Sequence, residues 1–325
     1  MKKCTIGGQA VMEGVMMKSP EGYGLAVRKE DGTIVREYHK NKKVRAKGSF
    51  ATWPVVRGVA IFIDALVTGV RLTMRSAELL GEDITEEPSR FEKWLAEKLG
   101  KSVFDIAMVI AVVLAIGLSV GLFVILPSFL ASLFPLKGLL YSLAEGLVRL
   151  VIFLGYLLAI SRLKAIRRVF AYHGAEHKTI ACYENDEDLT PENAMKYTRL
   201  HPRCGTNFMF LVMAVAILFF ACVPSLEMLG VEATRGLSML YRIGTRLLFI
   251  PVVAGLSYEV LRAAAKGDNL FARIVRAPGL ALQRLTTVEP DESMVEVAIV
   301  AFQLALDPPA EDSSQIPDSS DQTEE

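Results

Sequence analysis

Long runs of hydrophobic residues dominate the chain from about residue 105 onward, whereas the first 50 residues mix short apolar and polar stretches. The run from 106 to 136 contains no charged residue, and about 20 apolar residues are enough for a helix to cross a bilayer. Three later runs have a similar character, although Arg242 and Arg246 interrupt the last of them. The pattern predicts about four transmembrane helices, over residues 106–136, 138–160, 208–226 and about 237–261.

Residues 55–80 predict a different kind of helix, with a narrow polar stripe on a wide apolar surface. Arg57, Asp64, Arg71 and Glu78 recur every seventh residue, so they share one face of an α-helix. Such a helix suits the membrane interface or the side of a bundle of spans. The alternative is a core helix of a soluble domain.

The first 50 residues predict short strands. Residues 25–29 and 34–38 flank an Asp31-Gly32 pair, which is a strong signal for a β-hairpin. The stretch 7–17 is rich in Gly and Met and is expected to lie close against another element, because glycine permits close backbone approach. The expected fold class is a mainly α membrane protein with a small N-terminal β-hairpin region and an amphipathic interfacial helix.

Basic residues predict the orientation in the membrane. Arg162, Lys164, Arg167 and Arg168 follow the second expected span, and Lys266 follows the fourth. By the positive-inside rule, both termini and the loop 161–206 lie in the cytoplasm, and the chain is a multi-pass protein of the cell membrane. The expected divisions are a β-rich region (1–50), an amphipathic helix with its connector (51–100), a four-span membrane region (101–262), cytoplasmic C-terminal helices (263–306) and a disordered acidic tail (307–325).

The C-terminal cytoplasmic helices are expected at 268–286 and 290–306, with Pro290 in the first turn of the second.

The overall composition limits the classes of binding partner that we expect. The 325 residues are 52% hydrophobic with a formal net charge of zero, so the lipid bilayer is an expected partner and nucleic acid is not. Other membrane proteins are possible partners. The cysteines have no regular spacing, which indicates a reducing compartment, and no cleavable signal peptide is visible.

Three of the four histidines lie between the second and third expected spans, in the polar segment 161–206. Since no proline interrupts residues 145–185, the second span is expected to continue as a helix through His173-Gly-Ala-Glu176-His177. On that helix the two imidazoles lie one turn apart and can share a metal ion. The pattern is also the inverted zinc-peptidase signature, in which the glutamate is the general base.

A second motif, His201-Pro-Arg-Cys204-Gly, has the two-residue spacing of a zinc knuckle. We therefore expect a divalent metal, zinc by ligand type, at His173, His177, His201 and Cys204, with Glu176 as the catalytic base. Four protein ligands would make the site structural, whereas three would leave a position for water. The bland alternative is that the histidines contact lipid headgroups or cap carbonyls and that Cys204 is a small buried residue.

Other charged residues carry weaker expectations. Glu145 and Arg149 lie one turn apart in the second expected span and are expected to form a structural ion pair. Glu13 lies in an apolar stretch, either buried with a shifted pKa or on a surface hairpin. The acidic run 184–188, with Glu184, is expected to be solvated surface.

Several segments resemble, in the same order, those of the YqhQ-type family of bacterial membrane proteins, whose function is unknown. The likeness spans about residues 3–306. Such proteins are commonly described as predicted metal-dependent enzymes, so the resemblance implies a metal at His173, Glu176, His177, His201 and Cys204 and implies no particular reaction. The matching segments are 7–17, Trp53–Gly58, Tyr172–Thr179 and His201–Thr206.

Two functions from different classes follow. The first is a metal-dependent hydrolase at the cytoplasmic membrane face, with an unknown substrate and with Glu176 moving the proton. The second is a non-enzymatic membrane scaffold or membrane-protein assembly factor, in which a structural metal clips the 161–206 loop. Three metal ligands favour the first function and four favour the second.

Overall fold

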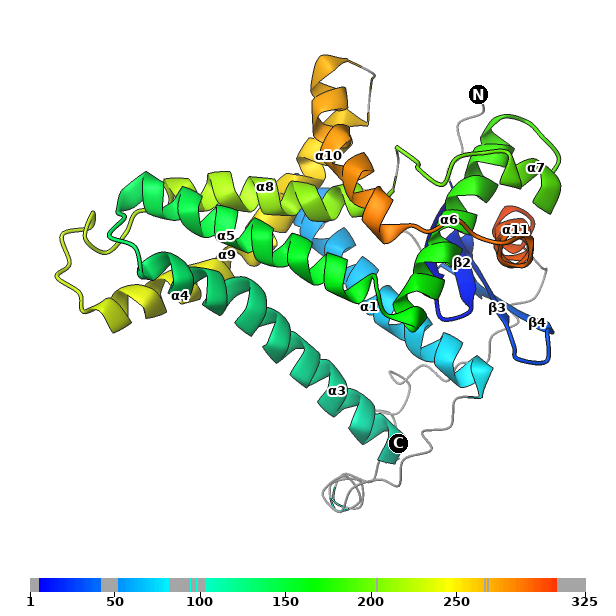
Figure 1. The fold of residues 1–325 in the computed structure, drawn as a ribbon, viewed down its shortest axis with the longest axis horizontal. Helices are drawn as coiled ribbons and strands as arrows, with labels where there is room; N and C mark the ends of the chain where they lie inside the picture. Colours follow the sequence, from blue (N-terminus) through cyan, green and yellow to red (C-terminus); the bar gives the residue numbers. More distant parts are fainter. Residues whose placement is uncertain are drawn as a thin grey trace.

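The computed structural model describes residues 6–41, 52–81, 94, 98, 103–202, 204–265, 267 and 269–308. In this part of the chain a bundle of long helices adjoins a lobe that contains a β-sheet (Figure 1). Most of the expected connector 82–102 and the acidic tail beyond 308 lie outside the described residues. The helices are α1 (Val56–Leu80), α3 (Val103–Val120), the π-helical turn η2 (Gly121–Ile125), α4 (Leu126–Ser132), α5 (Gly138–Ile160), α6 (Lys164–Glu184), α7 (Pro191–Met195), α8 (Thr206–Cys222), α9 (Arg235–Ala264), α10 (Leu270–Thr286) and α11 (Glu292–Leu306).

The sheet is an antiparallel meander with its strands in chain order. The Asp31-Gly32 hairpin is confirmed: the Asp31 carboxylate accepts the Thr33 N–H at 2.9 Å, and Gly32 has a φ of +86°. The Gly- and Met-rich stretch 7–17 forms a second hairpin, with Glu13 in its turn at a φ of +48°. The strands are β1 (Gly7–Val11), β2 (Gly14–Lys18), β3 (Gly22–Arg28) and β4 (Ile34–Lys40).

Both faces of the sheet are covered, because successive side chains of a strand point to opposite sides. In β2, Val15 and Met17 join a hydrophobic cluster with residues of α6 and α11, whereas Met16 joins a second cluster with Leu72 of α1. Strand β1 lies at the edge of the sheet and contacts α6. The sheet therefore holds α6 against its edge and one face, and holds α1 against the other face.

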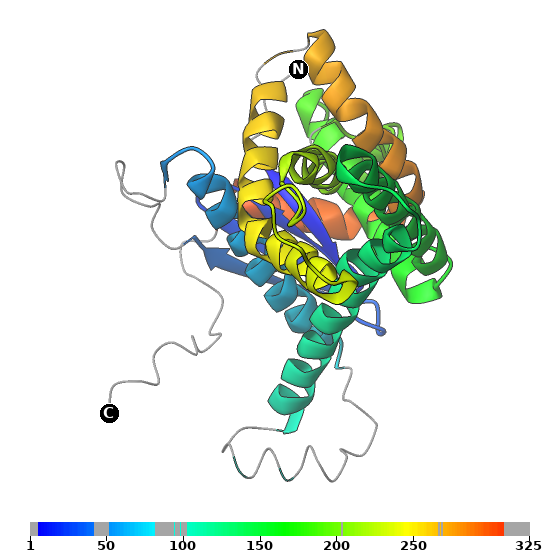
Figure 2. The same ribbon diagram turned by 90° about the vertical axis from the view of Figure 1, so that its left-hand side faces the viewer.

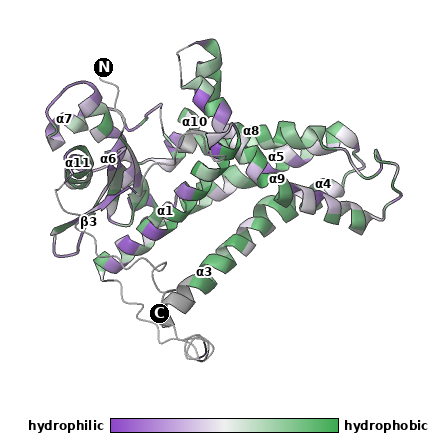
Figure 3. Cartoon of the chain, turned by 180° about the vertical axis from the view of Figure 1, so that it is seen from behind, coloured by the Kyte–Doolittle hydropathy of each residue, from purple (hydrophilic) through white to green (hydrophobic). Residues whose placement is uncertain are grey.

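Among the described residues, three helical segments are long and apolar enough to cross a membrane: Val109–Ser132, Gly138–Ile160 and Gly236–Ala264. Figure 3 shows the apolar residues that dominate these helices. The third expected span, 208–226, is the shorter helix α8, which ends at Cys222 because the residue before Pro224 is extended. Helix α8 lies between α5 and α9 and contacts both of them (Figure 2).

Helix α1 has the expected amphipathic character, and two of its arginines bind other elements of the protein, whereas Asp64 and Arg71 are exposed. Arg57 binds Glu259 of α9, and Arg75 binds Glu37 of β4 at 2.6 Å. The exposed side of α1 also carries large apolar residues, which include Leu66 and Val70. This arrangement does not fit a core helix of a soluble domain, because such a helix buries its apolar face.

The expectation that the second span runs unbroken into the first histidine motif is wrong. Helix α5 ends at Ile160, Leu163 has an extended backbone, and α6 begins at Lys164. The break lets α6 leave the bundle and pack against the edge of the sheet, beside α11 (Figure 1). Arg168 of α6 then binds Glu13 in the β1–β2 turn, which fixes the new direction and gives Glu13 a partner.

The two C-terminal helices are confirmed as α10 and α11. Pro290 does not lie in the first turn of α11, because Asp291 is the N-cap residue and accepts the Met294 N–H at 2.9 Å. The proline therefore precedes the cap, and the N-cap carboxylate begins the helix in its place.

The charged residues inside the span helices are paired, as the sequence predicts. Glu145 binds Arg149 of its own helix at 2.8 Å and binds Arg246 of α9. Arg242 lies over the ring of Tyr141, with its guanidinium carbon 3.8 Å from the ring centroid. These contacts join α5 to α9 in the interior of the bundle.

Candidate metal centre

Helix α6 places His173, Glu176 and His177 in the interior of the sheet-containing lobe. Other side chains of α6 belong to the hydrophobic cluster that packs on one face of the sheet, among them Ala171, Tyr172 and Ala175. Glu176 is 4% exposed and His177 is 1% exposed, so these polar groups face protein rather than bulk water. Their burial requires partners for them inside the fold.

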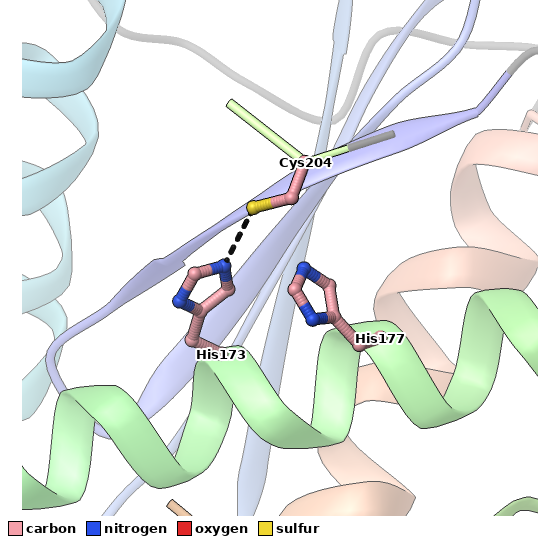
Figure 4. A group of neighbouring side chains, drawn as sticks. All are labelled: His173, His177 and Cys204. Atoms are coloured by element: carbon pink, nitrogen blue, oxygen red, sulfur yellow. Dashed lines mark hydrogen bonds between the residues drawn. The ribbon is translucent and has the colours of Figure 1, made fainter. Parts of the chain in front are cut away.

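Three side chains meet at one point, as the sequence predicts. The possible ligand atoms of His173, His177 and Cys204 all lie within 4.8 Å of one another. His173 Nε2 is 3.1 Å from Cys204 Sγ, and the two imidazole centroids are 4.5 Å apart. In Figure 4 both rings rise from α6 toward the loop that carries Cys204. Ligand atoms around a tetrahedral zinc ion are about 3.5 Å apart, so a contraction of about 1 Å would complete the site.

Backbone carbonyls hold both imidazoles in one tautomer. His173 Nδ1 donates to the Thr286 carbonyl at 2.9 Å, and His177 Nδ1 donates to the Arg199 carbonyl at 2.6 Å. Each Nε2 therefore carries a lone pair that can bind a metal. This is the usual arrangement around metal-binding histidines, in which the second nitrogen donates to a carbonyl or carboxylate.

Burial sets the protonation of His177. It lowers the pKa of His177 to about 3, because the imidazolium is disfavoured away from water and beside His173. His177 is consequently neutral at physiological pH, which is the state that metal binding needs. Among the residues that the structure describes, no hydrogen-bond partner reaches His177 Nε2.

Glu176 lies on the same helix, between the two histidines and the edge strand β1. Burial raises the pKa of Glu176 to about 8; His173 and the Gly8 N–H oppose this shift, and Cys204 adds to it. A Cβ atom on Gly8 would lie 2.7 Å from Glu176 Cδ, so the strand backbone lies directly against the carboxyl group. Glu176 Oε2 has no hydrogen-bond partner within the described part of the chain.

The fourth expected ligand, His201, is near the centre but outside the group of three. Its ring is 5.6 Å from that of His177, and its Nε2 is 3.4 Å from Glu184 Oε2. Gln283 of α10 holds the His201 backbone with two hydrogen bonds of 2.8 Å: its Oε1 accepts from the His201 N–H, and its Nε2 donates to the His201 carbonyl. The structure therefore brings three of the four expected ligands together.

The expectation of a solvated acidic run is wrong for one residue. Glu184 is 2% exposed and ends α6 beside His201, whereas Asp186, Glu187 and Asp188 are exposed. Sequence reasoning also missed Gln283 and the carbonyls of Thr286 and Arg199. The helical spacing of His177 and Glu184, seven residues apart on one face, was the signal that could have indicated the buried position of Glu184.

A cavity of about 690 Å³ lies beside this centre. It runs between β1, α1, α6 and the loop before α8, and Glu176, His177 and Cys204 are in its wall. Lys18 and Asp64, which form an ion pair of 3.1 Å, line the same space. A ligand in the cavity could therefore reach the three-residue centre from the side of the sheet edge.

The donor set suits zinc. Imidazole nitrogen and thiolate sulfur are its usual ligands, whereas calcium and magnesium take oxygen ligands. Both histidines already present a lone pair, and the Cys204 sulfur lies at the third corner. The side chains present thus fit a divalent, zinc-like ion with three protein ligands.

Comparison with known proteins identifies relatives but no activity. A family model described as "Protein of unknown function (DUF1385)" matches residues 53–308. The chain is 35% identical over 310 residues to "Uncharacterized protein YqhQ" of Bacillus subtilis (strain 168), and the match covers 92% of each chain. No solved structure matches the chain. The expected YqhQ-type resemblance is therefore confirmed, and the chain belongs to the DUF1385 family of proteins of unknown function.

Proposed function

We propose that the chain is a metal-dependent hydrolase of the cell membrane, with His173, His177 and Cys204 as ligands of one divalent metal ion. One observation carries the proposal: three ligand atoms lie within 4.8 Å of one another beside a cavity of about 690 Å³. Three protein ligands leave one coordination position for water or substrate, as in catalytic zinc sites. The ion that this ligand set favours is zinc.

Glu176 is the proposed proton acceptor. This role needs its carboxylate form, and the positive charge of a bound metal would favour that form by lowering the pKa of Glu176 from its raised value in the metal-free protein. When bound, the metal would polarise a carbonyl or phosphoryl oxygen and lower the pKa of water. As the water oxygen bonds to the carbonyl carbon or phosphorus, Glu176 takes its proton, and it delivers that proton to the leaving atom as the old bond breaks. Throughout the reaction, His173 and His177 keep their Nδ1–H groups hydrogen-bonded to the backbone carbonyls of Thr286 and Arg199.

The same proposal includes a topology with four spans and cytoplasmic termini. Helix α8 is apolar and lies between α5 and α9, which supports its place as a fourth span. The basic residues at the start of α6, including Arg167 and Arg168, support a cytoplasmic position for the metal centre. The bilayer is then a partner of α1 and of the span helices.

A second candidate is a membrane scaffold or assembly factor with a structural metal. Its support is His201, whose ring is 5.6 Å from that of His177. A rotation of His201 away from Glu184 would supply a fourth ligand and close the site to water. The metal would then tie the loop 199–205 to α6, and other membrane proteins would be the partners.

The first test counts metal in the purified full-length protein by mass spectrometry. We expect about one zinc ion per chain for the wild type, in line with a single three-ligand centre. His173→Ala and Cys204→Ala should lose it. His39→Ala is the matched control, because His39 is also buried but lies on β4, stacked on Tyr23. Metal-free wild-type protein would overturn the proposal.

The second test separates the two functions. Glu176→Gln keeps the size of the side chain and removes the carboxylate, so a hydrolase should keep its zinc and lose about 10²–10⁴-fold in activity on a panel of acyl and phosphate esters. His201→Ala should keep both the zinc and the activity. If His201→Ala loses the zinc, and Glu176→Gln retains full function in cells, the scaffold is the better account.

A further inference from the structure

A second cavity, of about 410 Å³, lies among the span helices. Its wall comes from α1, η2, α5, α8 and α9 and is almost entirely apolar. The volume lies within the range of about 300–1,000 Å³ that small-molecule sites occupy. Representative lining residues are Phe62, Phe153, Phe208, Met213, Phe220 and Val253.

Two arginines line this cavity without making it polar. Arg149 donates from Nη2 to Glu145 and from Nε to the Phe123 carbonyl at 2.8 Å, and Arg246 binds the other oxygen of Glu145. Phe123 belongs to the π-helical turn η2, an irregular element that is frequent at functional sites. Both guanidinium groups thus bind the carboxylate of Glu145, which balances part of their charge inside the bundle. An apolar occupant fits this wall better than an anionic one.

The length of the cavity matches one leaflet of a bilayer. Its wall on α8 extends from Phe208 to Phe220, twelve residues later, and this corresponds to about 18 Å along a helix. Half of a hydrocarbon core is about 15 Å. The helices that enclose the cavity include segments long and apolar enough to cross a membrane, so acyl chains are the apolar groups that surround them.

Neighbouring residues on two helices line the two cavities. On α1, Ile61 lines the metal-centre cavity and the next residue, Phe62, lines the apolar one. At the start of α8, Gly205 lines the first and Phe208 the second. The rings of Phe62 and Phe208 have centroids 6.0 Å apart, so the part of the apolar cavity that they line is the part nearest in the chain to the metal-centre cavity. A single molecule with a polar head and one apolar chain would occupy both.

We infer that the ligand of the metal centre is a lipid-like amphiphile, with its polar head beside His177 and Glu176 and its acyl chain in the apolar cavity between α8 and α9. This inference rests on the proposed function for the role of the head, but not for the binding of the chain. The Phe62–Phe208 pair marks the boundary between head and chain. The chain end lies near Phe220 and Val253.

The test uses lysophosphatidylcholine whose acyl chain carries a photoreactive diazirine, either beside the ester or at the chain end. The full-length protein in lipid nanodiscs is irradiated, and labelled peptides are identified by mass spectrometry. The chain-end probe should label Met213, Phe220 and Val253, and the probe beside the ester should label Phe62 and Phe208. Unlabelled lysophosphatidylcholine should compete with both. Labelling confined to the exposed positions Leu118 and Leu218, without competition, would overturn the inference.

A matched pair of variants checks the site. Ala216→Trp places an indole in the cavity and should reduce the competed labelling at least about ten-fold, since the space is then filled. Leu218→Trp adds an indole to the same helix at a position that is 67% exposed, and it should leave the labelling unchanged. If thermal unfolding shows that Ala216→Trp does not fold, Val212→Phe fills the same cavity with a smaller group.

Two protein states separate this inference from the proposed function. The labelling is repeated on chelator-treated protein and on zinc-loaded protein. Competed labelling in both states, with no hydrolysis of any ester, supports the lipid site and contradicts the hydrolase. Zinc-dependent hydrolysis of soluble esters that Ala216→Trp does not change, with no competed labelling, supports the hydrolase and contradicts the lipid site.

Discussion

Two polar pairs with the same spacing lie in the interior of the chain, and their surroundings differ. Glu145 and Arg149 are four residues apart on α5, and His173 and His177 are four residues apart on α6. Both carboxylate oxygens of Glu145 are occupied, because Oε1 accepts from Ser128 and Arg149 and Oε2 accepts from a guanidinium of α9. The pair on α5 is therefore complete within the protein.

The pair on α6 is incomplete. His177 Nε2 and the neighbouring Glu176 Oε2 are buried without a hydrogen-bond partner among the residues that the structure describes. Buried polar atoms are nearly always hydrogen-bonded, so an unpartnered pair beside a cavity indicates a place for a ligand. Spacing alone therefore does not distinguish a structural pair from a ligand-binding site. The distinguishing feature is whether each buried polar atom has a hydrogen-bond partner within the protein.

The largest expected effect comes from breaking the complete pair. Glu145→Leu leaves Arg149 and Arg246 buried without their carboxylate, so the free energy of unfolding should fall by about 3–5 kcal/mol. Thermal unfolding of the protein in detergent measures the loss. The double variant with Arg246→Leu should recover part of it, because fewer buried charges are then unpaired. An unchanged melting temperature for Glu145→Leu would show that these charges are solvated.

The buried groups around the incomplete pair, Glu176 above all, should instead make the stability of the protein depend on pH. In metal-free protein, burial raises the pKa of Glu176 to about 8 from the ordinary value of 4.5 for a glutamate. Between these values the folded chain binds more protons than the unfolded chain, so the free energy of unfolding falls as pH rises. From about pH 5 to about pH 7.5 this group should contribute a loss of about 3 kcal/mol. Chemical unfolding at each pH measures the slope.

Glu176→Gln removes this titration and should flatten the fall in the free energy of unfolding between about pH 5 and pH 7.5, whereas Glu21→Gln, at an exposed position, should not. His177 acts with the opposite sign. Its pKa of about 3 lies below the ordinary value of 6.5, so acidification through that window protonates the unfolded chain first and destabilises the fold. A variant of Glu176 with the wild-type slope would contradict the buried carboxyl group.

Zinc should bind the histidine pair on α6 and thereby stabilise the folded protein. At a free zinc concentration 100 times the dissociation constant, binding to the folded chain alone adds about 2.7 kcal/mol to the free energy of unfolding. The Glu145→Leu variant should gain the same amount, since its defect lies in the bundle. His177→Ala should gain nothing. Differential scanning fluorimetry with and without zinc measures the gain, and equal stabilisation of His177→Ala would place the metal elsewhere.

Local patterns predicted the parts of the fold that depend on local spacing. The Asp31-Gly32 hairpin, the helices α1, α10 and α11, and the approach of His173 to His177 all follow from periodicities of two or 3.6 residues. The meeting of both histidines with Cys204 also agreed with the motif spacing. In the part of the chain that the structure describes, three helices have the length and composition of membrane spans, where four were expected.

The remaining features depend on contacts between distant segments. The break between α5 and α6 follows from the packing of α6 on the sheet, and no proline or glycine marks it. The carbonyl of Thr286 is 113 residues from the imidazole that it orients, and a backbone group leaves no trace in a motif. His201 was expected beside the metal because its spacing to Cys204 was right, and the approach of Glu184 was not visible in that spacing.

The smallest expected effect tests what holds Glu176 in place. A Cβ atom on Gly8 would lie 2.7 Å from Glu176 Cδ and 2.8 Å from the Met16 carbonyl oxygen. The carboxyl group must move to relieve the first contact, and the backbone of the neighbouring strand must shift to relieve the second. Gly8→Ala should therefore cost about 1–3 kcal/mol and weaken the pH dependence between about pH 5 and pH 7.5 that Glu176 produces.

The adjacent position offers the control. A Cβ atom on Gly7 would meet nothing within 4 Å, so Gly7→Ala should change the free energy of unfolding by less than about 0.5 kcal/mol. Equal tolerance of both variants would mean that β1 does not position the carboxyl group. A specific loss at Gly8 would instead explain the contrast between the two helices: side chains of other helices hold Glu145, whereas a strand backbone holds Glu176 and leaves one of its oxygens free for chemistry.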